Sequence, residues 1–218
     1  MAVLVVLAAA WALWASPLLV VRTVQVDGNR ILPADQVREA AGIGRGTPLL
    51  RVDVGAAEAR VARLPQVDSV EVTRGWPSTV VITVAERVPL AVVGEAGRRA
   101  LVDVEGVLFD TISGDPPAGV VPLEVAHPGP GNPAMIAALQ AIRALPPKIR
   151  AQVTVATAPE PGDVTLTLTD GTVVNWGDAD RSRTKGSVVT ALLDQFKSGA
   201  LERAKTIDVS EPDAVVLR

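Results

Sequence analysis

The feature that most limits how this 218-residue chain can fold is its first stretch, residues 1–21. The stretch contains no charged side chain and is interrupted only by Ser16 and Pro17. An α-helix rises about 1.5 Å per residue, so roughly 20 apolar residues cross the ~30 Å hydrocarbon layer of a bilayer. Trp11 and Trp14 lie toward the far end, and such side chains favour the membrane interface. We expect residues 1–21 to form a single transmembrane helix.

Two alternatives for this segment stay open from the residues alone. A cleaved signal peptide normally begins with basic residues, which are absent, although Ala10-Trp11-Ala12 has the small-x-small form of a cleavage site. A buried core helix could also be wholly apolar, but such a helix is uncommon in a domain of this size. Because the sequence begins inside the apolar segment, it offers no charged flank to which the positive-inside rule could be applied.

The composition of the chain excludes several functional classes. The 21 Lys and Arg and the 24 Asp and Glu residues give a formal net charge of −3. Mild acidity without basic blocks argues against general nucleic-acid binding. The chain has no cysteine, which excludes disulfides and thiolate chemistry, and its one histidine, His127, excludes mechanisms that need two imidazoles. We predict no cofactor and no metal.

Residues 22–87 are predicted to follow the order strand, helix, helix, strand, strand. The strand predictions come from alternating apolar and polar residues. The first helix has Pro33 in its first turn and Gly42 after its end, and Asp53 can serve as the N-cap of the second. The predicted strands are 23–27, 67–73 and 79–85, and the predicted helices are 33–41 and 53–64.

Residues 88–218 are predicted to consist mainly of strands with two helices. The first helix carries an apolar stripe and ends at Pro146-Pro147, and the second spans 180–203. Asp170-Gly171 is a strong signal for a tight hairpin. The stripe consists of Met135, Leu139, Ile142 and Leu145, and the predicted strands are 88–93, 99–103, 107–109, 120–125, 152–155, 164–169, 172–176, 205–209 and 214–218.

Several residues could take part in catalysis, but each has a simpler structural interpretation. Ser182 and Lys185 have the Ser-x-x-Lys spacing in which a lysine activates a serine. The companion motifs of that class are missing, so we interpret the pair as the charged first turn of a solvent-facing helix. Asp103 and Glu105 are interpreted as carboxylates of a surface turn, and His127 as a solvated loop residue.

Glycines and tryptophans outside these motifs are also interpreted as structural. Gly42, Gly44 and Gly46 lack the remaining elements of a phosphate-binding loop and fit turns better. Trp76 and Trp176 lie at strand ends, where we expect them to cover the edge of a core. We therefore find no catalytic constellation in this sequence.

The last predicted strand suggests a different kind of function. It contains the apolar run Ala214-Val215-Val216-Leu217. At the edge of a sheet, its unpaired N–H and C=O groups could pair with a strand of another chain, and a proline at Val216 should disturb that pairing. The alternative is that the strand is central or is covered by the last helix, and the pattern alone does not decide between the two.

Five short segments, each weak alone, occur in an order that is specific as a set. They are Val24-x-Val26-x-Gly28-Asn29, Pro65-x-Val67-x-x-Val70-x-Val72, Arg74-x-Trp76-Pro77, Val84-x-Glu86-Arg87-x-Pro89 and Leu101-Val102-Asp103-x-x-Gly106. In this order they resemble the FtsQ/DivIB family of bacterial cell-division proteins. The resemblance covers residues 20–218 and includes the closing Ile207-Asp208-Val209.

This resemblance implies a single-pass protein of the bacterial inner membrane, with its C-terminal bulk outside the cytoplasm at the division septum. It implies an α+β fold with a transmembrane helix at 1–21, a POTRA domain of β-α-α-β-β order at 22–87 and a β-rich domain with flanking helices at 88–218. Members of the family are not enzymes. They are scaffolds that link divisome proteins to septal peptidoglycan synthesis.

The resemblance also implies which partners the chain binds. These are small bitopic proteins of the FtsB/DivIC and FtsL families and, indirectly, the septal peptidoglycan synthase complex. In the family a partner segment adds a strand beside the last strand of the β-domain. The matching residues here are Ser210, Glu211, Asp213, Ala214, Val215, Val216 and Leu217.

Two other functions are considered beside this scaffold. One is a POTRA-bearing component of an outer-membrane export system, although such proteins usually carry a long C-terminal barrel for which the strands predicted here are too few. The other is an exported hydrolase that uses Ser182 and Lys185.

Overall fold

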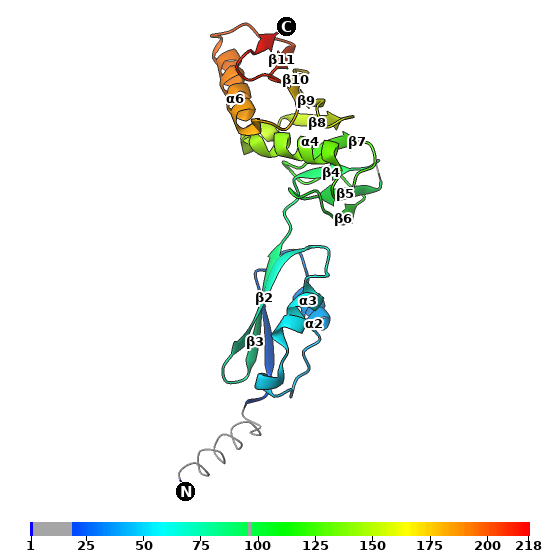
Figure 1. Ribbon diagram of the computed structural model, residues 1–218, viewed down its shortest axis with the longest axis vertical. Coiled ribbons are helices and arrows are strands. Elements are labelled where there is room, and N and C mark those ends of the chain that lie inside the picture. Colours follow the sequence, from blue (N-terminus) through cyan, green and yellow to red (C-terminus); the bar gives the residue numbers. More distant parts are fainter. Residues whose placement is uncertain (2–18, 96) are drawn as a thin grey trace. The chain divides into compact units, whose positions relative to one another are not determined.

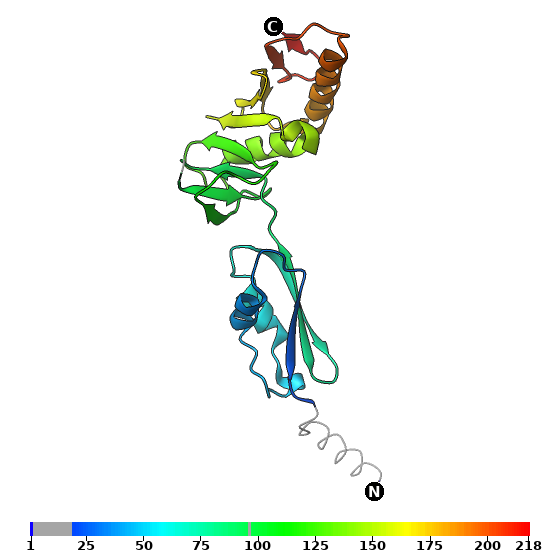
Figure 2. The same ribbon diagram turned by 180° about the vertical axis from the view of Figure 1, so that it is seen from behind.

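The computed structural model describes residues 1, 19–95 and 97–218, which form two compact units, residues 1–87 and 88–218. Figures 1 and 2 show each unit from two opposite sides. Nearly all of the transmembrane helix expected at 1–21 lies outside the described residues. Within the described part of the chain, no helix combines the length and the apolar character that crossing a membrane requires.

The first unit is a three-stranded sheet with two helices packed on one face (Figure 1). Its strand order is β1-β3-β2, with the central β3 parallel to β1 and antiparallel to β2. The predicted order strand, helix, helix, strand, strand is confirmed, with one additional 3-10 helix, η2. The elements are β1 (Thr23–Asp27), α2 (Ala34–Ala41), η2 (Leu49–Arg51), α3 (Val54–Val61), β2 (Val67–Gly75) and β3 (Thr79–Glu86).

The helix ends of the first unit are set by the residues that the sequence indicated. Gly42 ends α2 in the left-handed conformation, with φ of 61°, and its amide donates to two carbonyls of the last turn. Asp53 caps α3 by accepting a hydrogen bond from the amide of Ala56. The helix α3 ends at Val61, earlier than the predicted end near Leu64.

Charged side chains join distant segments of the first unit through backbone groups. The Glu86 carboxylate accepts hydrogen bonds from the amides of residues 30–32 at 2.6 to 3.1 Å. The Arg74 guanidinium donates to the carbonyl oxygens of Leu49 and Val52 at 3.1 and 2.7 Å. Comparable bonds join Arg38 to the carbonyl of Val24, Arg60 to the carbonyl of Ala41, and Glu58 to the amide of Val72.

The second unit is built on a nine-stranded sheet with the order β12-β11-β10-β9-β8-β7-β4-β5-β6. Its neighbouring strands are antiparallel except for β4–β7, β7–β8 and β10–β11, which are parallel. The elements are β4 (Ala91–Val93), β5 (Arg99–Val102), β6 (Leu108–Ile112), β7 (Val121–Val125), α4 (Pro133–Ala144), α5 (Pro147–Arg150), β8 (Val153–Ala158), β9 (Val164–Leu168), β10 (Val173–Gly177), α6 (Ser182–Ser198), β11 (Thr206–Asp208) and β12 (Val216–Leu217).

The core of the second unit lies between one face of this sheet and the helices α4 and α6 (Figure 2). Gly186 allows α6 to approach α4, because a Cβ atom at this position would lie 2.5 Å from the carbonyl oxygen of Ala144. The helix α6 is shorter than predicted and ends at Gly199, which adopts φ of 74°. The short helix α5, which begins directly after Pro146, was not predicted.

Over β8, β9 and β10 the other face of this sheet is mostly polar, whereas over β4, β5 and β6 it carries a second apolar cluster that contains Val92, Leu101 and Phe109. Residues of β8, β9 and β10 alternate between buried apolar side chains on the helix side and partly exposed polar side chains on this face. Among the described residues, neither α4 nor α6 covers it. The polar residues are Thr154, Thr157, Thr165, Thr167 and Asn175.

Candidate functional site

The last strand lies at the outer edge of the nine-stranded sheet. β12 comes last in the strand order and pairs with β11 in antiparallel register, with Leu217 opposite Ile207 and Val216 opposite Asp208. The side chains of Val216 and Leu217 are 43% and 37% exposed. The strand is therefore neither central nor covered, which decides the alternative that the sequence pattern left open.

Backbone hydrogen bonds define which groups of β12 face the open edge. Thr206 and Arg218 exchange two backbone bonds, of 2.8 and 3.0 Å. In an antiparallel pair, residues bonded in this way alternate with residues whose N–H and C=O groups point away from the partner strand. Val216 therefore directs its backbone groups toward Asp208 in β11, whereas Leu217 directs its N–H and C=O groups toward the open edge.

This alternation changes the expected effect of a proline at Val216. The amide that proline would remove at this position pairs with β11, so the substitution would disturb the sheet itself. The residue whose amide is available to a further strand is Leu217. An exposed edge with apolar side chains is a template for the addition of a strand from another chain.

Two carboxylates fix the turn that leads into β12. Asp208 accepts hydrogen bonds from the hydroxyl and the amide of Ser210 at 2.7 and 3.1 Å, and the hydroxyl bond is the main reason that the pKa of Asp208 is lowered. Arg181 donates to Asp213 at 2.7 Å, which lowers the pKa of Asp213 and raises the pKa of Arg181. The turn is thereby tied to the start of α6.

The seven residues that the resemblance assigns to partner binding lie within residues 210–217, around this turn and strand, and are interrupted only by the buried Pro212. Most of them are exposed, and Val215 is partly buried against the core of the unit. The exposed members are Ser210, Glu211, Asp213, Ala214, Val216 and Leu217.

Ser182 and Lys185 lie in the first turn of α6, where both make structural contacts. The Ser182 hydroxyl accepts from the indole nitrogen of Trp176 at 3.1 Å and donates to the carbonyl oxygen of Ala179 at 2.8 Å. Lys185 was expected to face solvent, but it is only 1% exposed. Its ammonium group donates to the carboxylate and the carbonyl oxygen of Asp178 at 2.7 and 3.1 Å, and the carboxylate bond lowers the pKa of Asp178.

The remaining candidates for chemistry are Asp103 and Glu105, which share one turn, and His127, which lies in a separate loop. Asp103 is buried, so the expectation that its carboxylate lies on a surface turn is wrong, whereas Glu105 is exposed as expected. The Asp103 carboxylate accepts from the amides of Glu105 and Val107, both at 2.9 Å, which fixes the turn between β5 and β6. His127 is exposed in the loop before α4 with φ of 53°.

The two tryptophans at strand ends have different environments. Trp176 is fully buried in the core of the second unit, as expected. Trp76 lies in the turn between β2 and β3 and is 59% exposed, so the expectation that it covers the edge of a core is wrong. Trp176 lies within β10, whereas Trp76 directly follows β2. The sequence pattern places both near the end of an alternating strand and therefore does not distinguish them.

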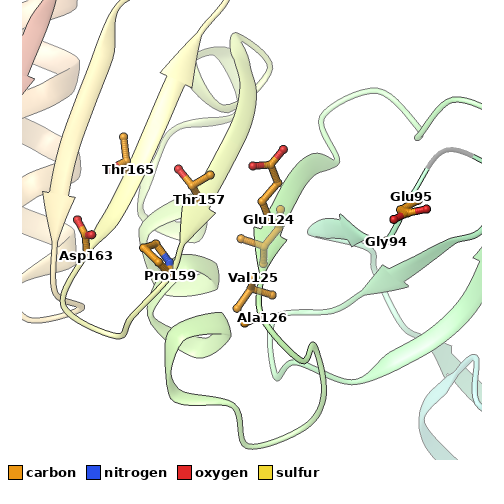
Figure 3. Close-up of a pocket in the computed structure, with 10 residues that line it drawn as sticks. Gly94, Glu95, Glu124, Val125, Ala126, Thr157, Pro159, Asp163 and Thr165 are labelled. Carbon is orange, nitrogen blue, oxygen red and sulfur yellow. The ribbon is translucent and has the colours of Figure 1, made fainter.

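A hollow of about 890 Å³ lies at the ends of β4, β7 and β8 and the start of β9 (Figure 3). Its lining contains the carboxylates of Glu95, Glu124 and Asp163 and the hydroxyls of Thr157 and Thr165, without any Lys, Arg or His. The hollow is therefore suited to cationic rather than anionic groups. No motif indicated it, because the lining residues come from segments far apart in the sequence.

Comparisons with known proteins cover both units. Residues 19–87 match the family model described as POTRA domain, FtsQ-type, and residues 91–210 match the model described as cell division protein FtsQ/DivIB, C-terminal. The chain is 41% identical to a cell division protein FtsQ of Mycolicibacterium smegmatis, over 92% of this chain and 58% of that protein.

Other relatives have the same name. A cell division protein FtsQ of Mycobacterium tuberculosis is 38% identical over 93% of this chain and 62% of its own length, and one of Streptomyces collinus is 37% identical over 98% of this chain and 84% of its own length. The chain thus spans less than two thirds of the length of the mycobacterial relatives.

Proposed function

The chain belongs to the FtsQ/DivIB family of bacterial cell-division proteins, and from this premise we propose that it is a non-catalytic, membrane-anchored scaffold of the divisome. In this proposal the apolar stretch within residues 1–21 supplies a single-pass anchor in the inner membrane, residues 22–87 are the POTRA domain, and residues 88–218 are the β-domain that binds partners outside the cytoplasm. The membrane-crossing part ends before Val20, because Val20 pairs with Pro48 and Val21 is buried in the core of the first unit. The scaffold acts at the septum, where it links divisome assembly to peptidoglycan synthesis.

The partner is a bitopic protein of the FtsB/DivIC type, which adds a strand beside β12. The observation that carries this proposal is the direction of the Leu217 backbone groups, which point away from β11. A strand placed there would pair with an N–H and a C=O group that the sheet itself does not use. An FtsL-type protein would bind the scaffold through the same FtsB/DivIC-type partner, and the scaffold would contact the septal peptidoglycan synthase complex only indirectly.

The surroundings of the edge suggest which side chains the partner strand carries. On the helix side of β12, Val215 lies beside the core, and Val188 and Leu192 of α6 are only partly buried. On the opposite side, Val216 shares a face with Asp208. We expect a partner strand with apolar residues on its α6 side and polar residues on the other.

A modest interface suffices for this function. Two partners held in the same membrane encounter each other at a high effective concentration, so few contacts are needed for a stable complex. Backbone pairing also tolerates changes in the side chains of the edge strand, because its hydrogen bonds come from groups common to all residues except proline.

The two alternative functions are not favoured. The family models and the relatives are of FtsQ type, which does not support an outer-membrane export component. The hydroxyl of Ser182 and the ammonium of Lys185 are bound to Ala179 and Asp178, which does not support a hydrolase.

The proposal is tested by binding of the chain, inserted in lipid nanodiscs, to the extracytoplasmic segment of an FtsB/DivIC-type protein. Leu217→Pro removes the outward amide and places a ring in the path of the added strand, so affinity should fall at least about tenfold. Leu217→Ala keeps the amide and is the matched control, expected to change affinity by less than about threefold.

The outcomes separate the mechanism from the function. Equal loss in Leu217→Pro and Leu217→Ala would show recognition through the side chain and contradict strand addition. Full binding by Leu217→Pro would move the binding surface away from β12. An unmodified chain that binds no such partner would contradict the proposed scaffold function itself.

A further inference from the structure

One end of the first unit is formed by two segments that flank the start of β1. The amide of Arg22 donates to the carbonyl oxygen of Ser78 in the β2–β3 turn at 2.8 Å. Val21 donates to the carbonyl of Thr47 and accepts from the amide of Gly46, both at 2.8 Å. Residues 44–51 and 74–78, with Arg22 between them, are named the proximal surface, and Figures 1 and 2 show both segments at the end of the unit where β1 begins.

The proximal surface is held in place by Arg74. Its guanidinium reaches from the end of β2 to the carbonyl oxygens of Leu49 and Val52, which joins the hairpin to η2. Leu49, the first residue of η2, is fully buried, whereas its neighbour Leu50 in the same helix is directed outward. The two segments therefore form one preorganised surface.

The exposed side chains of this surface are apolar or basic. Trp76 is 59% and Leu50 48% exposed, so this one surface leaves two large apolar side chains in contact with water. Arg22 and Arg45 are also exposed, and residues 44–51 and 74–78 contain no Asp or Glu. The nearest following carboxylate, that of Asp53, caps α3.

This combination matches the chemistry of a membrane interface. Tryptophan prefers the headgroup region, where its ring is sheltered and its N–H group stays hydrated. Arginines close to a bilayer bind the phosphates of anionic lipids. A protein partner would leave unexplained why the surface surrounds the point where the apolar segment 1–21 joins the unit.

We propose that the proximal surface lies on the bilayer, with Trp76 and Leu50 in the headgroup region and Arg22 and Arg45 on anionic phospholipid headgroups. The inference rests on the proposed anchor within residues 1–21, which ends before Val20. Val21 is 1% exposed and bonded to the unit, so the chain has little free length before the fold begins. At ~3.4 Å per residue, residues 19–22 span about 10 Å at most, which keeps the surface close to the membrane.

The consequence is a second attachment beside the anchor. A single anchoring helix leaves the first unit free to rotate about the point where the chain leaves the membrane. Contact of Trp76 and Leu50 with lipid would fix which end of the sheet faces the membrane. The surface thereby sets the orientation in which the unit stands on the membrane.

The absence of cysteine from the sequence makes a direct test possible, because each introduced cysteine is unique. The full chain carrying Leu50→Cys is labelled with the polarity-sensitive dye NBD and reconstituted into phosphatidylcholine vesicles with phosphatidylglycerol. Ile31→Cys is the matched control, since Ile31 is an 83% exposed aliphatic residue beside the opposite end of β3. Lipids brominated near the headgroup should quench the Leu50 probe at least about twofold more than the Ile31 probe.

The charge contribution is tested in the same vesicles. Arg45→Glu should reduce the quenching of the Leu50 probe about twofold, whereas Arg63→Glu, an exposed position after α3, should not change it. Omission of phosphatidylglycerol should have the same effect as Arg45→Glu. Hydrogen exchange of β1, β2 and β3 in each variant checks that the unit stays folded.

Three results would overturn the inference. If the chain floats with vesicles but both probes are quenched equally, the proposed anchor stands and the contact of the proximal surface with lipid is refuted. Quenching that is the same with and without phosphatidylglycerol refutes the anionic headgroups as ligands. A chain that does not float with vesicles refutes the anchor and, with it, this inference.

Discussion

The two units of this chain are stabilised in different ways. In the first unit, charged side chains such as Glu86 and Arg74 bind backbone groups of distant segments. Both units have an apolar core, but the core of the second is larger and lies between the sheet and the helices α4 and α6. A small unit buries a smaller share of its surface on folding, so specific polar bonds carry more of its stability. We therefore expect the stability of the first unit to depend more on side-chain charge and pH. The stability of the second unit should depend more on the volume of its core side chains.

The largest effect is expected from Gly186→Ala in the second unit. In a helix interior, alanine is favoured over glycine by about 1 kcal/mol, so propensity alone predicts stabilisation. The new Cβ atom, however, would lie 2.5 Å from the carbonyl oxygen of Ala144, and we expect a net loss of about 2–3 kcal/mol. Thermal unfolding measures the change, with Gly162→Ala as control, since a Cβ there meets no atom within 4 Å. Stabilisation by Gly186→Ala would contradict the tight packing of α4 and α6.

A smaller effect is expected from Glu86→Gln in the first unit. The amides of residues 30–32 lose their charged acceptor, which should cost about 1–2 kcal/mol because the site is only partly buried. Hydrogen exchange of the first unit measures the loss. Glu71→Gln, at an exposed position in β2, is the control and should have no effect. An unchanged exchange rate in Glu86→Gln would contradict the claim that bonds between charged side chains and backbone groups stabilise the first unit.

The same carboxylate gives the first unit a defined pH dependence. Burial alone would raise the pKa of Glu86, but the three amides lower it below its ordinary value. A lowered pKa in the folded state stabilises the unit fully above the unfolded pKa of about 4.3, and the stabilisation is lost as pH falls through the folded value. We expect unfolding of the first unit on acidification to begin below about pH 4.5 and to be less steep in Glu86→Gln.

The second unit also contains a charged contact, in which the buried ammonium of Lys185 pairs with the carboxylate of Asp178, a side chain that is 56% exposed. Lys185→Met replaces a buried ammonium by an apolar group of similar length and should change stability by less than about 1 kcal/mol. Asp178→Ala leaves that ammonium with a carbonyl partner only, so it should be the more destabilising of the two. Urea unfolding of both variants measures the difference. The reverse order would mean that the ion pair, and not packing, stabilises the start of α6.

The smallest effect is expected at the turn before β12. Asp213→Asn removes the ion pair with Arg181, both partners of which are exposed, so the melting temperature should stay unchanged. Amide exchange of residues 210–217 should nevertheless become faster. The Arg181 bond lowers the pKa of Asp213, so the unmodified chain should show the same local loosening only as pH falls below about 4. Equal exchange in both proteins at pH 7 would show that the turn does not depend on this pair.

Much of the fold could be predicted because local signals agree with it. Alternation identified β1, and Asp53 and Gly42 marked helix ends, since a cap depends on neighbouring residues only. The helix η2 was missed because it is held by Leu49 in the core and by Arg74 from a strand far along the chain. Such a partner leaves no periodic pattern in the sequence.

The features of the candidate sites were harder to predict. An apolar strand near the end of the sequence was recognisable, but which of its residues face the open edge depends on the register with β11. The burial of Lys185 depends on Asp178, whose loop lies over the first turn of α6. The exposure of Trp76 could not be separated from the burial of Trp176, because both occupy similar places in the pattern.

The strand order also gives the second unit a fixed length. The chain enters the sheet at β4 and reaches the edge at β12, and the order β4-β7-β8-β9-β10-β11-β12 separates these strands by six steps. Neighbouring strands lie about 4.8 Å apart, so the sheet spans roughly 30 Å between the two. The hydrogen-bonded sheet therefore holds β4 and β12 at a fixed separation. The distance from β4 to β12 is set by the number of strands between them, so insertion or deletion of one hairpin would shift the open edge at β12 by two strand spacings.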